Sequence, residues 1–322
     1  MAYQNVATPR FYVNVVEWCI KSGIDIQDGH SAVINTLPVN PTSFGNLIFH
    51  GLQGMHSNAF VAVLGHKFYT DGVYYKIGTL DGNGTNLNVY KPMTNIVNSG
   101  IANVTECYTN HDGFSISEFD VHNDIFFWKS SGSVVGSVIV GTFYEMKNAP
   151  NLSLSLNIEY GSTDETTSYT GSSFSNTFWS KQPNWGELGA WELGSDATYT
   201  PFSRSGRRVW TLTFSYMDDG DLWGSNQNIE QIIGDAVNST LYDDDDLINN
   251  TTFKYNLLSD DNFFSQVWNK TLGGTIPFIF QPDKDNNNPD QFAICKIKEN
   301  SLKATQSAFN VYDISLTIEE VW

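Results

Sequence analysis

The chain has 322 residues, of which 40% are hydrophobic and 14% aromatic, so it has enough apolar material for more than one packed unit and global disorder is excluded. Its 35 acidic and 17 basic side chains give a formal net charge of −18. A field of that sign repels phosphate backbones, which excludes nucleic-acid binding. Only 16% of the residues are charged, so a surface of Ser, Thr, Asn and Gly is expected, which suits β-structure with polar turns.

The first residues and the cysteines indicate where the chain is made. Met1 to Val6 contains no basic region followed by an apolar run, so we expect no signal peptide. No apolar stretch approaches the ~18 residues of a membrane span. Cys19, Cys107 and Cys295 are odd in number and far apart, which argues against a disulfide framework or a CxxC metal site. The sequence therefore predicts reduced thiols and synthesis in a reducing cytoplasm.

Short strands are predicted throughout the first half. The β-branched and aromatic run at 10–21 favours a strand, with a helical turn as the lesser option. Unbroken apolar runs at 59–64 and 138–144 predict strands buried on both faces. Further short strands are expected at 73–77 and 125–128. Short strands separated by turn residues favour a β-sandwich over residues 1–160, and the jelly roll of the galactose-binding type is the natural candidate.

Three segments of the second half of the chain alternate strictly between apolar and polar residues. They are residues 152–160, 209–216 and 312–318. Successive side chains of a strand point to opposite faces, so each segment predicts a strand with one buried face and one face that contacts water or a partner. The fold class expected is therefore mainly β, with two β-domains.

The remaining second half mixes one helix with long polar segments. Residues 261–272 predict a helix, capped by Ser259 or Asp260 and ended by Gly273 and Gly274. Residues 277–280 and 292–297 predict a hairpin with a long tip. Residues 161–200 are too long for a plain linker, and we expect aromatic side chains to hold part of them in place. The acidic segment 218–250 predicts a solvated excursion with one short helix near 229–237.

The tryptophans of the 161–200 segment are its candidate binding residues. Trp179, Trp185 and Trp191 offer flat faces either to sugar rings or to a neighbouring subunit. Simple packing of a long arm onto the sheet is the more ordinary interpretation. The sequence leaves the three alternatives open.

No motif predicts catalysis or a cofactor. The six histidines follow no metal-binding spacing, and the sequence has no nucleophile elbow, GxGxxG motif or P-loop. The loop 283–290 lacks the Gly and Glu of an EF-hand, so Asp283, Asp285 and Asp290 are only weak metal candidates at a turn-forming hairpin tip. The sequence predicts a protein that is not an enzyme and needs no cofactor.

The second half resembles tail structural proteins of tailed bacteriophages, of the distal-tail or baseplate type, including tail proteins of marine phages. The resemblance lies in residues 205–216, in the helix ending at Leu272-Gly273-Gly274, in the strands 277–282 and 292–295, and in the final segment 310–322. It covers roughly residues 140–322 and consists of strand patterns. It implies a tail-tube-like β-domain with one packed helix that assembles into a ring and carries an additional sandwich outside.

The resemblance leads to a division into a sandwich at 1–160 and a tube-like domain at 161–322, or alternatively to an N-terminal strand belonging to the tube-like domain with the sandwich inserted after it. The function it implies is that of a virion tail protein in a homo-oligomeric ring, touching tube, hub and fibre proteins. Arg207 and Arg208, in a chain with few cations, are candidates for contacts with a neighbour's carboxylates, or for ordinary surface salt bridges. The alternative function is a carbohydrate-binding module on the virion, and a glycan hydrolase or lyase comes third.

Overall fold

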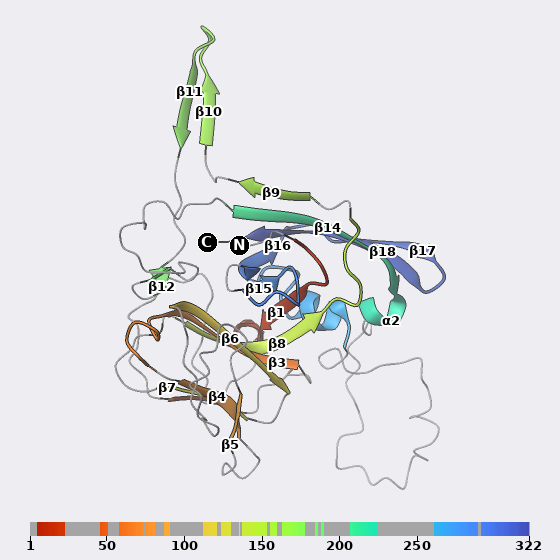
Figure 1. The fold of residues 1–322 in the computed structure, drawn as a ribbon. Helices are drawn as coiled ribbons and strands as arrows, with labels where there is room; N and C mark the ends of the chain where they lie inside the picture. The colour runs from red at the N-terminus through yellow and green to blue at the C-terminus, as the bar shows by residue number, and fades with distance from the viewer. Residues whose placement is uncertain are drawn as a thin grey trace.

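A computed structural model of the chain describes residues 5–22, 46–50, 58–73, 75–80, 87–90, 112–120, 124–129, 135, 137–152, 155–159, 163–177, 184–185, 188–189, 207–223, 261–288 and 291–321. The fold is mainly β, as the alternating and unbroken apolar runs predict. Short helical segments account for a minor part of the described residues (Figure 1).

One antiparallel sheet of ten strands dominates the described residues. Its order is β6 (Gly113–Asp120), β3 (Asn58–His66), β8 (Ser137–Glu145), β1 (Arg10–Asn14), β15 (Phe278–Gln281), β16 (Ala293–Ile297), β18 (Val311–Glu320), β14 (Arg207–Asp218) and β9 (Ser155–Glu159). The tenth strand, β17 (Lys303–Ala308), pairs with β18 beside the point where β16 ends. Strands from the two ends of the sequence therefore lie side by side.

Strand β1 joins the two halves of this sheet. It pairs with β8 on one side and with β15 on the other. Its continuous apolar sequence is explained by burial on both faces, because Phe11 and Val13 point into one hydrophobic core while Tyr12 points into another. The strand thus separates two cores on opposite faces of one sheet.

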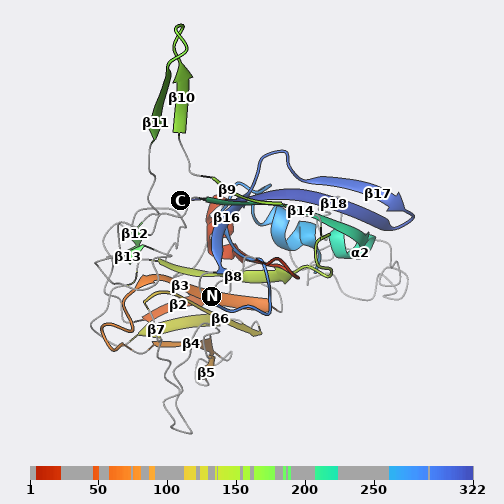
Figure 2. The ribbon, with the colours of Figure 1, turned by 45° about the horizontal axis from the view of Figure 1, so that its top comes forward.

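The first core lies inside the curve of the sheet, between β14 and β18 above and β1 and β8 below (Figure 2). It contains the inward-facing residues Trp210, Leu212, Phe214, Ile314, Leu316 and Ile318, which confirm the predicted alternation of both strands. The π-helical segment η2 (Phe264–Asn269) fills the space between them with Val267, and Phe263 precedes it. This segment is the packed helix expected near 261–272.

The second core lies on the opposite face of the sheet. Strands β3, β6 and β8 contribute Phe60, Phe114 and Ile139, while the second half contributes Ile279 and Phe292. A separate sheet of four strands, β2 (Asn46–His50), β7 (Asp124–Lys129), β4 (Tyr75–Leu80) and β5 (Leu87–Tyr90), lies below β3 and β6 (Figures 1 and 2). The two layers give this part a sandwich-like architecture, and the finer jelly-roll assignment stays a prediction.

The division of the chain at residue 160 also stays a prediction. The observed sheet contains strands from both sides of that boundary, and β1 lies between β8 of the first range and β15 of the second. The second core is likewise built from both ranges. The two sequence ranges are therefore joined by one continuous sheet and by a core to which both contribute.

Three local predictions need correction. Residues 10–21 form β1 and then helix α1 (Val15–Lys21), because the Asn14 side chain caps the backbone N–H of Glu17 and ends the strand. Of the strand predicted at 152–160, the structure describes β9 and residue 152, and Leu152, which the alternation assigns to the buried face, is fully exposed. The helix near 261 is capped by Asn262, whose side-chain Oδ1 accepts a hydrogen bond from the backbone N–H of Ser265 at 2.8 Å.

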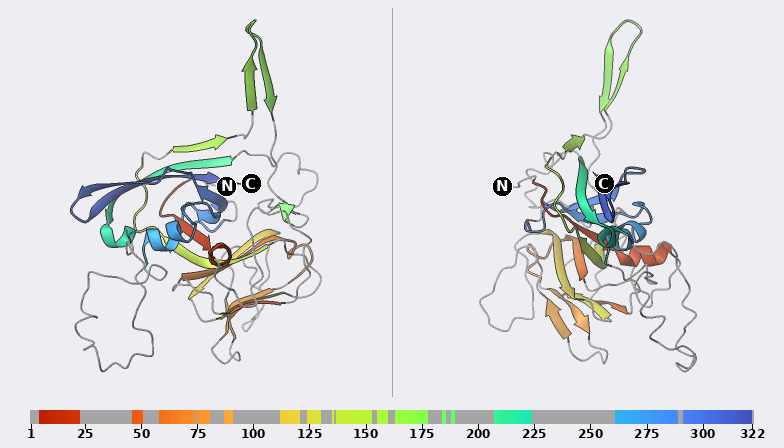
Figure 3. Two further views of the ribbon diagram at one scale, coloured as in Figure 1. Left: turned by 180° about the vertical axis from the view of Figure 1, so that it is seen from behind. Right: turned by 90° about the vertical axis from the view of Figure 1, so that its right-hand side faces the viewer.

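Two hairpins extend from the body of the molecule. The first, β10 (Thr163–Thr167) with β11 (Ser173–Thr177), points away from both sheets in every view, and we call it the arm (Figures 1 and 3). The second is formed by β17 and β18, near the short helix α2 (Asp219–Leu222). A small ladder pairs β12 (Asn184–Trp185) with β13 (Leu188–Gly189). Among the described residues no helix is long and apolar enough to cross a membrane.

Candidate assembly surfaces

The tip of the arm is a well-formed turn that displays a tyrosine. Gly171 has φ +84° and its N–H donates to Ser168 O at 2.9 Å, while Ser168 N–H donates to Ser172 O at 2.8 Å. This is a type I turn followed by a glycine in the left-handed region, a common three-residue hairpin connection. Tyr169 is fully exposed on the turn. A two-stranded hairpin is only marginally stable on its own, so the arm is suited to docking against another surface.

Strand β17 is an edge strand with little protection. All six residues, Lys303 to Ala308, are exposed, and among the described residues the strand pairs only with β18. Proteins usually guard such edges with charges, prolines or inward-pointing lysines. Here Lys303 is the single charge and the strand contains no proline. Its free N–H and C=O groups form a template for another strand.

Large apolar side chains are exposed along β14 and at both sides of the β14–β18 pair. Tyr216 is 81% exposed and Phe309, in the β17–β18 turn, is 87% exposed. Leu152 is fully exposed beside Asn151, whose N–H donates to Thr213 O of β14 at 2.7 Å. Exposed apolar side chains mark interaction surfaces where they form a contiguous patch.

Tyr216 is held in an unfavourable backbone conformation. Its φ is +59°, which costs an L-residue with a Cβ roughly 1–2 kcal/mol, and it lies in a bulge of β14 between Phe214 and Met217. The carboxylate of Asp313 accepts a hydrogen bond from Tyr216 N at 3.1 Å and stabilises the bulge. The bulge turns Met217 into the first core and leaves the Tyr216 ring outside.

Of the two candidate contact arginines, Arg208 is already bonded within its own chain. Its guanidinium donates to both carboxylate oxygens of Glu320, at 3.1 and 3.2 Å, and to Phe292 O at 3.2 Å. It also lies 5.1 Å from the ring centroid of Trp210. Arg208 therefore stabilises the meeting point of β14, β16 and β18. Arg207 pairs in register with Glu159 of β9, and its contact role stays a prediction.

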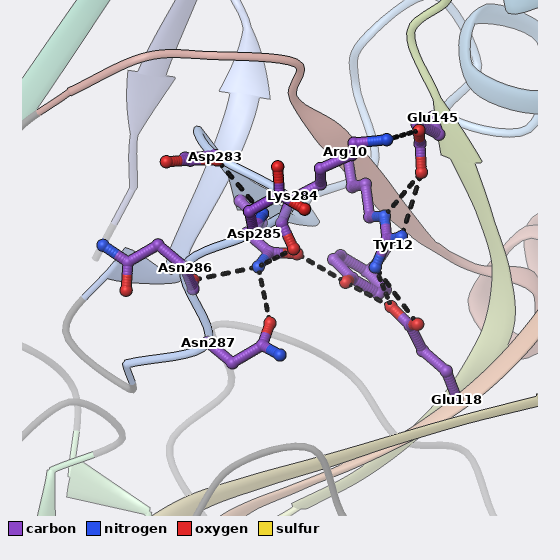
Figure 4. A network of polar contacts seen from close by, with 10 residues as sticks. Arg10, Tyr12, Glu118, Glu145, Asp283, Lys284, Asp285, Asn286 and Asn287 are labelled. Carbon is purple, nitrogen blue, oxygen red and sulfur yellow. Dashed lines mark hydrogen bonds and ion pairs between the residues drawn. The ribbon is translucent and has the colours of Figure 1, made fainter.

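A partly buried polar network joins the two halves of the large sheet at β1 (Figure 4). Arg10 donates to both oxygens of Glu118 at 3.0 and 3.1 Å, and its Nε donates to Glu145 at 3.0 Å. Burial by itself lowers the pKa of Arg10, but the interactions with Glu118, Tyr12 and Glu145 together outweigh it, and the net shift is upward. The network thus fixes β1 to β6 and β8 with charge-assisted bonds.

Tyr12 extends this network into the β15–β16 loop. Its hydroxyl lies 2.5 Å from Glu118 Oε1 and 2.7 Å from Gln281 Oε1. Burial raises the pKa of Glu118, against the opposing effects of Tyr12 and Arg10. Tyr12 thus has one hydroxyl proton for two nearby acceptor oxygens.

The loop after β15 is held by the same network. The amide nitrogen of Gln281 donates to Asn286 O and to Asn287 Oδ1, both at 3.0 Å. Lys284 Nζ donates to Glu145 Oε1 at 2.6 Å, and this bond, with those from Arg10, outweighs partial burial and lowers the pKa of Glu145. The donors and acceptors of the network are bonded to one another, so the network holds β1, β6, β8 and the loop after β15 together.

The metal candidates lie in this loop. Asp283 accepts from the N–H of Asp285 at 3.0 Å, which is the hydrogen bond of an Asx turn. Asp290 lies outside the described residues. Within the part of the chain that the structure describes, no group of three or more His, Cys, Asp or Glu side chains could hold a metal ion. The loop is built as a turn.

The tryptophan candidates remain open. Trp179 and Trp191 lie outside the described residues, and Trp185 is placed only by the backbone of β12. Their predicted role in binding sugars or subunits therefore stays a prediction.

A buried lysine lies away from these surfaces. Lys270 follows η2, is completely buried, and donates to Gln266 Oε1 at 2.7 Å. Burial lowers its pKa to about 7, and burial raises the pKa of the nearby Cys19 to about 11. Sequence reasoning did not single out Lys270, because nothing in its neighbourhood along the chain distinguishes it from a surface lysine.

Comparison with protein-family models, with curated proteins and with solved structures found no match to this chain.

Proposed function

We propose that this chain is a structural, non-enzymatic protein of a bacteriophage tail, forming a homo-oligomeric ring at the distal tail or tail tip. The ring would connect the tail tube to baseplate or fibre proteins. The proposal combines the strand patterns of residues 140–322, which resemble distal-tail proteins, with surfaces that a single copy leaves unsatisfied.

The observation that carries the proposal is the exposure of β17. A strand of six exposed residues with a free edge and few protective charges favours pairing with another chain. The arm with Tyr169 at its tip and the apolar residues Tyr216 and Phe309 add further exposed contact area. Heterologous contacts of this kind, repeated by rotation, generate closed rings.

The charge of the chain is compatible with this role. A ring of copies that each carry −18 would surround its channel with negative potential. Such a lining repels the phosphate backbone, so DNA can pass without adhering to the wall.

The alternative of a carbohydrate-binding module rests on Trp179, Trp185 and Trp191, and no described contact favours it over the ring. A glycan array with the full-length chain is the direct test of that alternative.

The ring is tested by measuring the mass of the purified full-length chain over a wide range of concentration, followed by electron microscopy of the largest species. We expect one discrete multimer with rotational symmetry. A monomer at every concentration would contradict the proposal.

A further inference from the structure

The sheet has two free edges near the proposed contact. Strands β9 and β17 flank the central pair β14–β18, with β9 beside β14 and β17 beside β18. Among the described residues neither strand has a second partner. Each copy thus presents two different open edges, which is the arrangement that a head-to-tail contact requires.

We propose that β17 of one copy pairs with β9 of the next copy, so that the sheet continues from subunit to subunit. This inference rests on the proposed ring and names the contact that closes it. Each neighbouring pair from β9 through β14 and β18 to β17 is antiparallel, so β9 and β17 run in opposite directions. Copies that are related by rotation about an axis roughly along the strands therefore meet as antiparallel strands.

The faces of the two strands decide which registers are allowed. Ala304 pairs with the buried Ile314, and Leu156 pairs with the buried Trp210, so both lie on the face toward the first core. A slip of one residue would turn one of these faces outward, so only every second register is allowed. Leu156 is only partly buried, and a strand added at the edge of β9 would cover it further.

Charge selects one of the allowed registers. Placing Lys303 opposite Glu159 joins opposite charges across the contact, and Glu159 already lies opposite Arg207 within its own copy. The resulting pairs are Lys303 with Glu159, Ala304 with Ile158, Thr305 with Asn157, Gln306 with Leu156, and Ser307 with Ser155. Positive and negative residues then alternate across three adjacent strands, which favours this register over its neighbours.

The same register brings the exposed apolar residues together. Continued past the ends of the two strands, it brings the β17–β18 turn with Phe309 of one copy toward the segment that precedes β9 in the next copy. Leu152 lies in that segment, and its neighbour Asn151 is bonded to β14 close to Tyr216. Phe309 of one copy thus meets Leu152 and Tyr216 of the next copy, and their exposure in a single copy is explained by their contact in the assembly.

The positions of the two edges are compatible with closure. Strand β9 pairs with Arg207 to Thr211, at the N-terminal end of β14. Strand β17 pairs with the first half of β18, and that half of β18 pairs with the C-terminal end of β14. The two open edges are therefore offset along the strand direction. Pairing these staggered edges shifts each copy along the strand direction. Such a shift tilts the strands, and closed barrels need this stagger.

The test introduces one cysteine on each edge of the full-length chain, Thr305→Cys with Asn157→Cys. Both residues are exposed and lie directly opposite in the proposed register. Opposite Cβ atoms in adjacent antiparallel strands are about 4.5–5.5 Å apart, within the range that a disulfide with small adjustments can bridge. Because each copy carries both cysteines, oxidation is expected to give a ladder of covalent multimers on a denaturing, non-reducing gel.

Three control variants accompany the double variant. All variants are made in a Cys107→Ser background, because Cys107 lies outside the described residues, whereas the native Cys19 and Cys295 are buried and do not compete. Each single variant should give no ladder. Thr305→Cys combined with Tyr169→Cys tests whether the arm tip, rather than β9, occupies the β17 edge. A ladder from that combination and none from the β9 combination would overturn the inference.

The outcomes separate this inference from the proposed function. If the wild-type chain forms a ring and the Thr305–Asn157 pair does not cross-link, the ring stands and the β9–β17 contact is wrong. If the wild-type chain stays monomeric, the proposed function itself is wrong. A ladder that ends at the mass of the wild-type ring supports both.

Discussion

Single residues show how this chain accommodates partly buried charge. Arg10 is surrounded by two carboxylates and Tyr12, so each partly buried charge of the network has a partner. Buried ion pairs add little net stability compared with apolar residues of similar size, but they are costly to break singly. Because Arg10, Glu118 and Glu145 come from three different strands, the network specifies how the strands of the junction are aligned.

Lys270 is the residue whose titration gives a pH prediction. Its folded pKa is about 7 and its ordinary value is 10.5, so between these values the unfolded chain binds a proton that the folded chain lacks. The free energy of unfolding of the wild type, relative to Lys270→Met, should therefore rise with pH from about 7 upward, by up to ~1.4 kcal/mol per pH unit. Below that window the difference should be constant.

Urea unfolding of both proteins from pH 6 to pH 9 measures this difference directly. Comparing wild type and variant cancels the titration of groups that both proteins share. Lys147→Met is the matched control, because Lys147 lies at the surface beside Asp261 and its loss should leave the pH profile unchanged. Parallel curves for wild type and Lys270→Met would show that Lys270 stays protonated in the folded chain.

At the scale of the element, β8 can approach β1 only because residue 141 is glycine. Gly141 pairs with Asn14, and a Cβ at this position would lie 1.7 Å from Val13 O and 2.9 Å from Val15 N. The obstacle is backbone, which no side-chain rotation can relieve, and it lies where β1 turns into α1. We expect Gly141→Ala to destabilise the fold by roughly 4 kcal/mol or more, the range of severe core overpacking and strain.

Thermal unfolding of Gly141→Ala, compared with Gly220→Ala, tests this prediction. At Gly220 the nearest atom to an added Cβ is Asp218 Oδ1 at 3.5 Å, an ordinary contact. The Gly220 variant should therefore melt close to the wild type, and the Gly141 variant should melt far lower or fail to fold. Equal melting temperatures would mean that the junction between β1 and β8 is more open than described.

Most strands were predictable because the pattern of apolar residues along a strand reflects how many of its faces are buried. The unbroken run at 59–64 and the alternation at 312–318 mark β3 and β18, since burial on two faces or on one face leaves different patterns. The order of the strands was not predictable, because β1 could pair with any strand of matching polarity. Phe11 and Val13 point to one face of β1 and Tyr12 to the other, but all three are apolar, so the sequence does not show that each face is buried in a different core.

The candidate surfaces were less visible in the sequence. The segment Lys303 to Ala308 neither alternates nor contains a large apolar residue, so the usual signal of a strand is absent. Its pairing is imposed by β18, which alternates strongly. Arg208 was noticed for its charge, but its partner Glu320 is 112 residues away and no local pattern connects the two.

For the whole molecule, two electrostatic effects on assembly oppose each other. The proposed Lys303–Glu159 contact would be a surface ion pair, and such pairs contribute about 0–1 kcal/mol. Each copy also carries a net charge of −18, and neighbouring copies repel over the screening length of the solution. With one modest attraction against the repulsion of two highly charged bodies, the repulsion should dominate the salt dependence.

We therefore expect added salt to promote assembly. Raising NaCl from about 0.01 M to about 0.1 M shortens the screening length from about 30 Å to about 10 Å, which removes most of the long-range repulsion and little of the short-range apolar contact. Sedimentation velocity at fixed protein concentration should show the multimer fraction rising over this range, while thermal melts at the same salt concentrations report on the fold separately. Dissociation by salt would mean instead that ion pairs hold the copies together, and it would favour a contact through Arg207 and Lys303 over the Phe309–Leu152 contact.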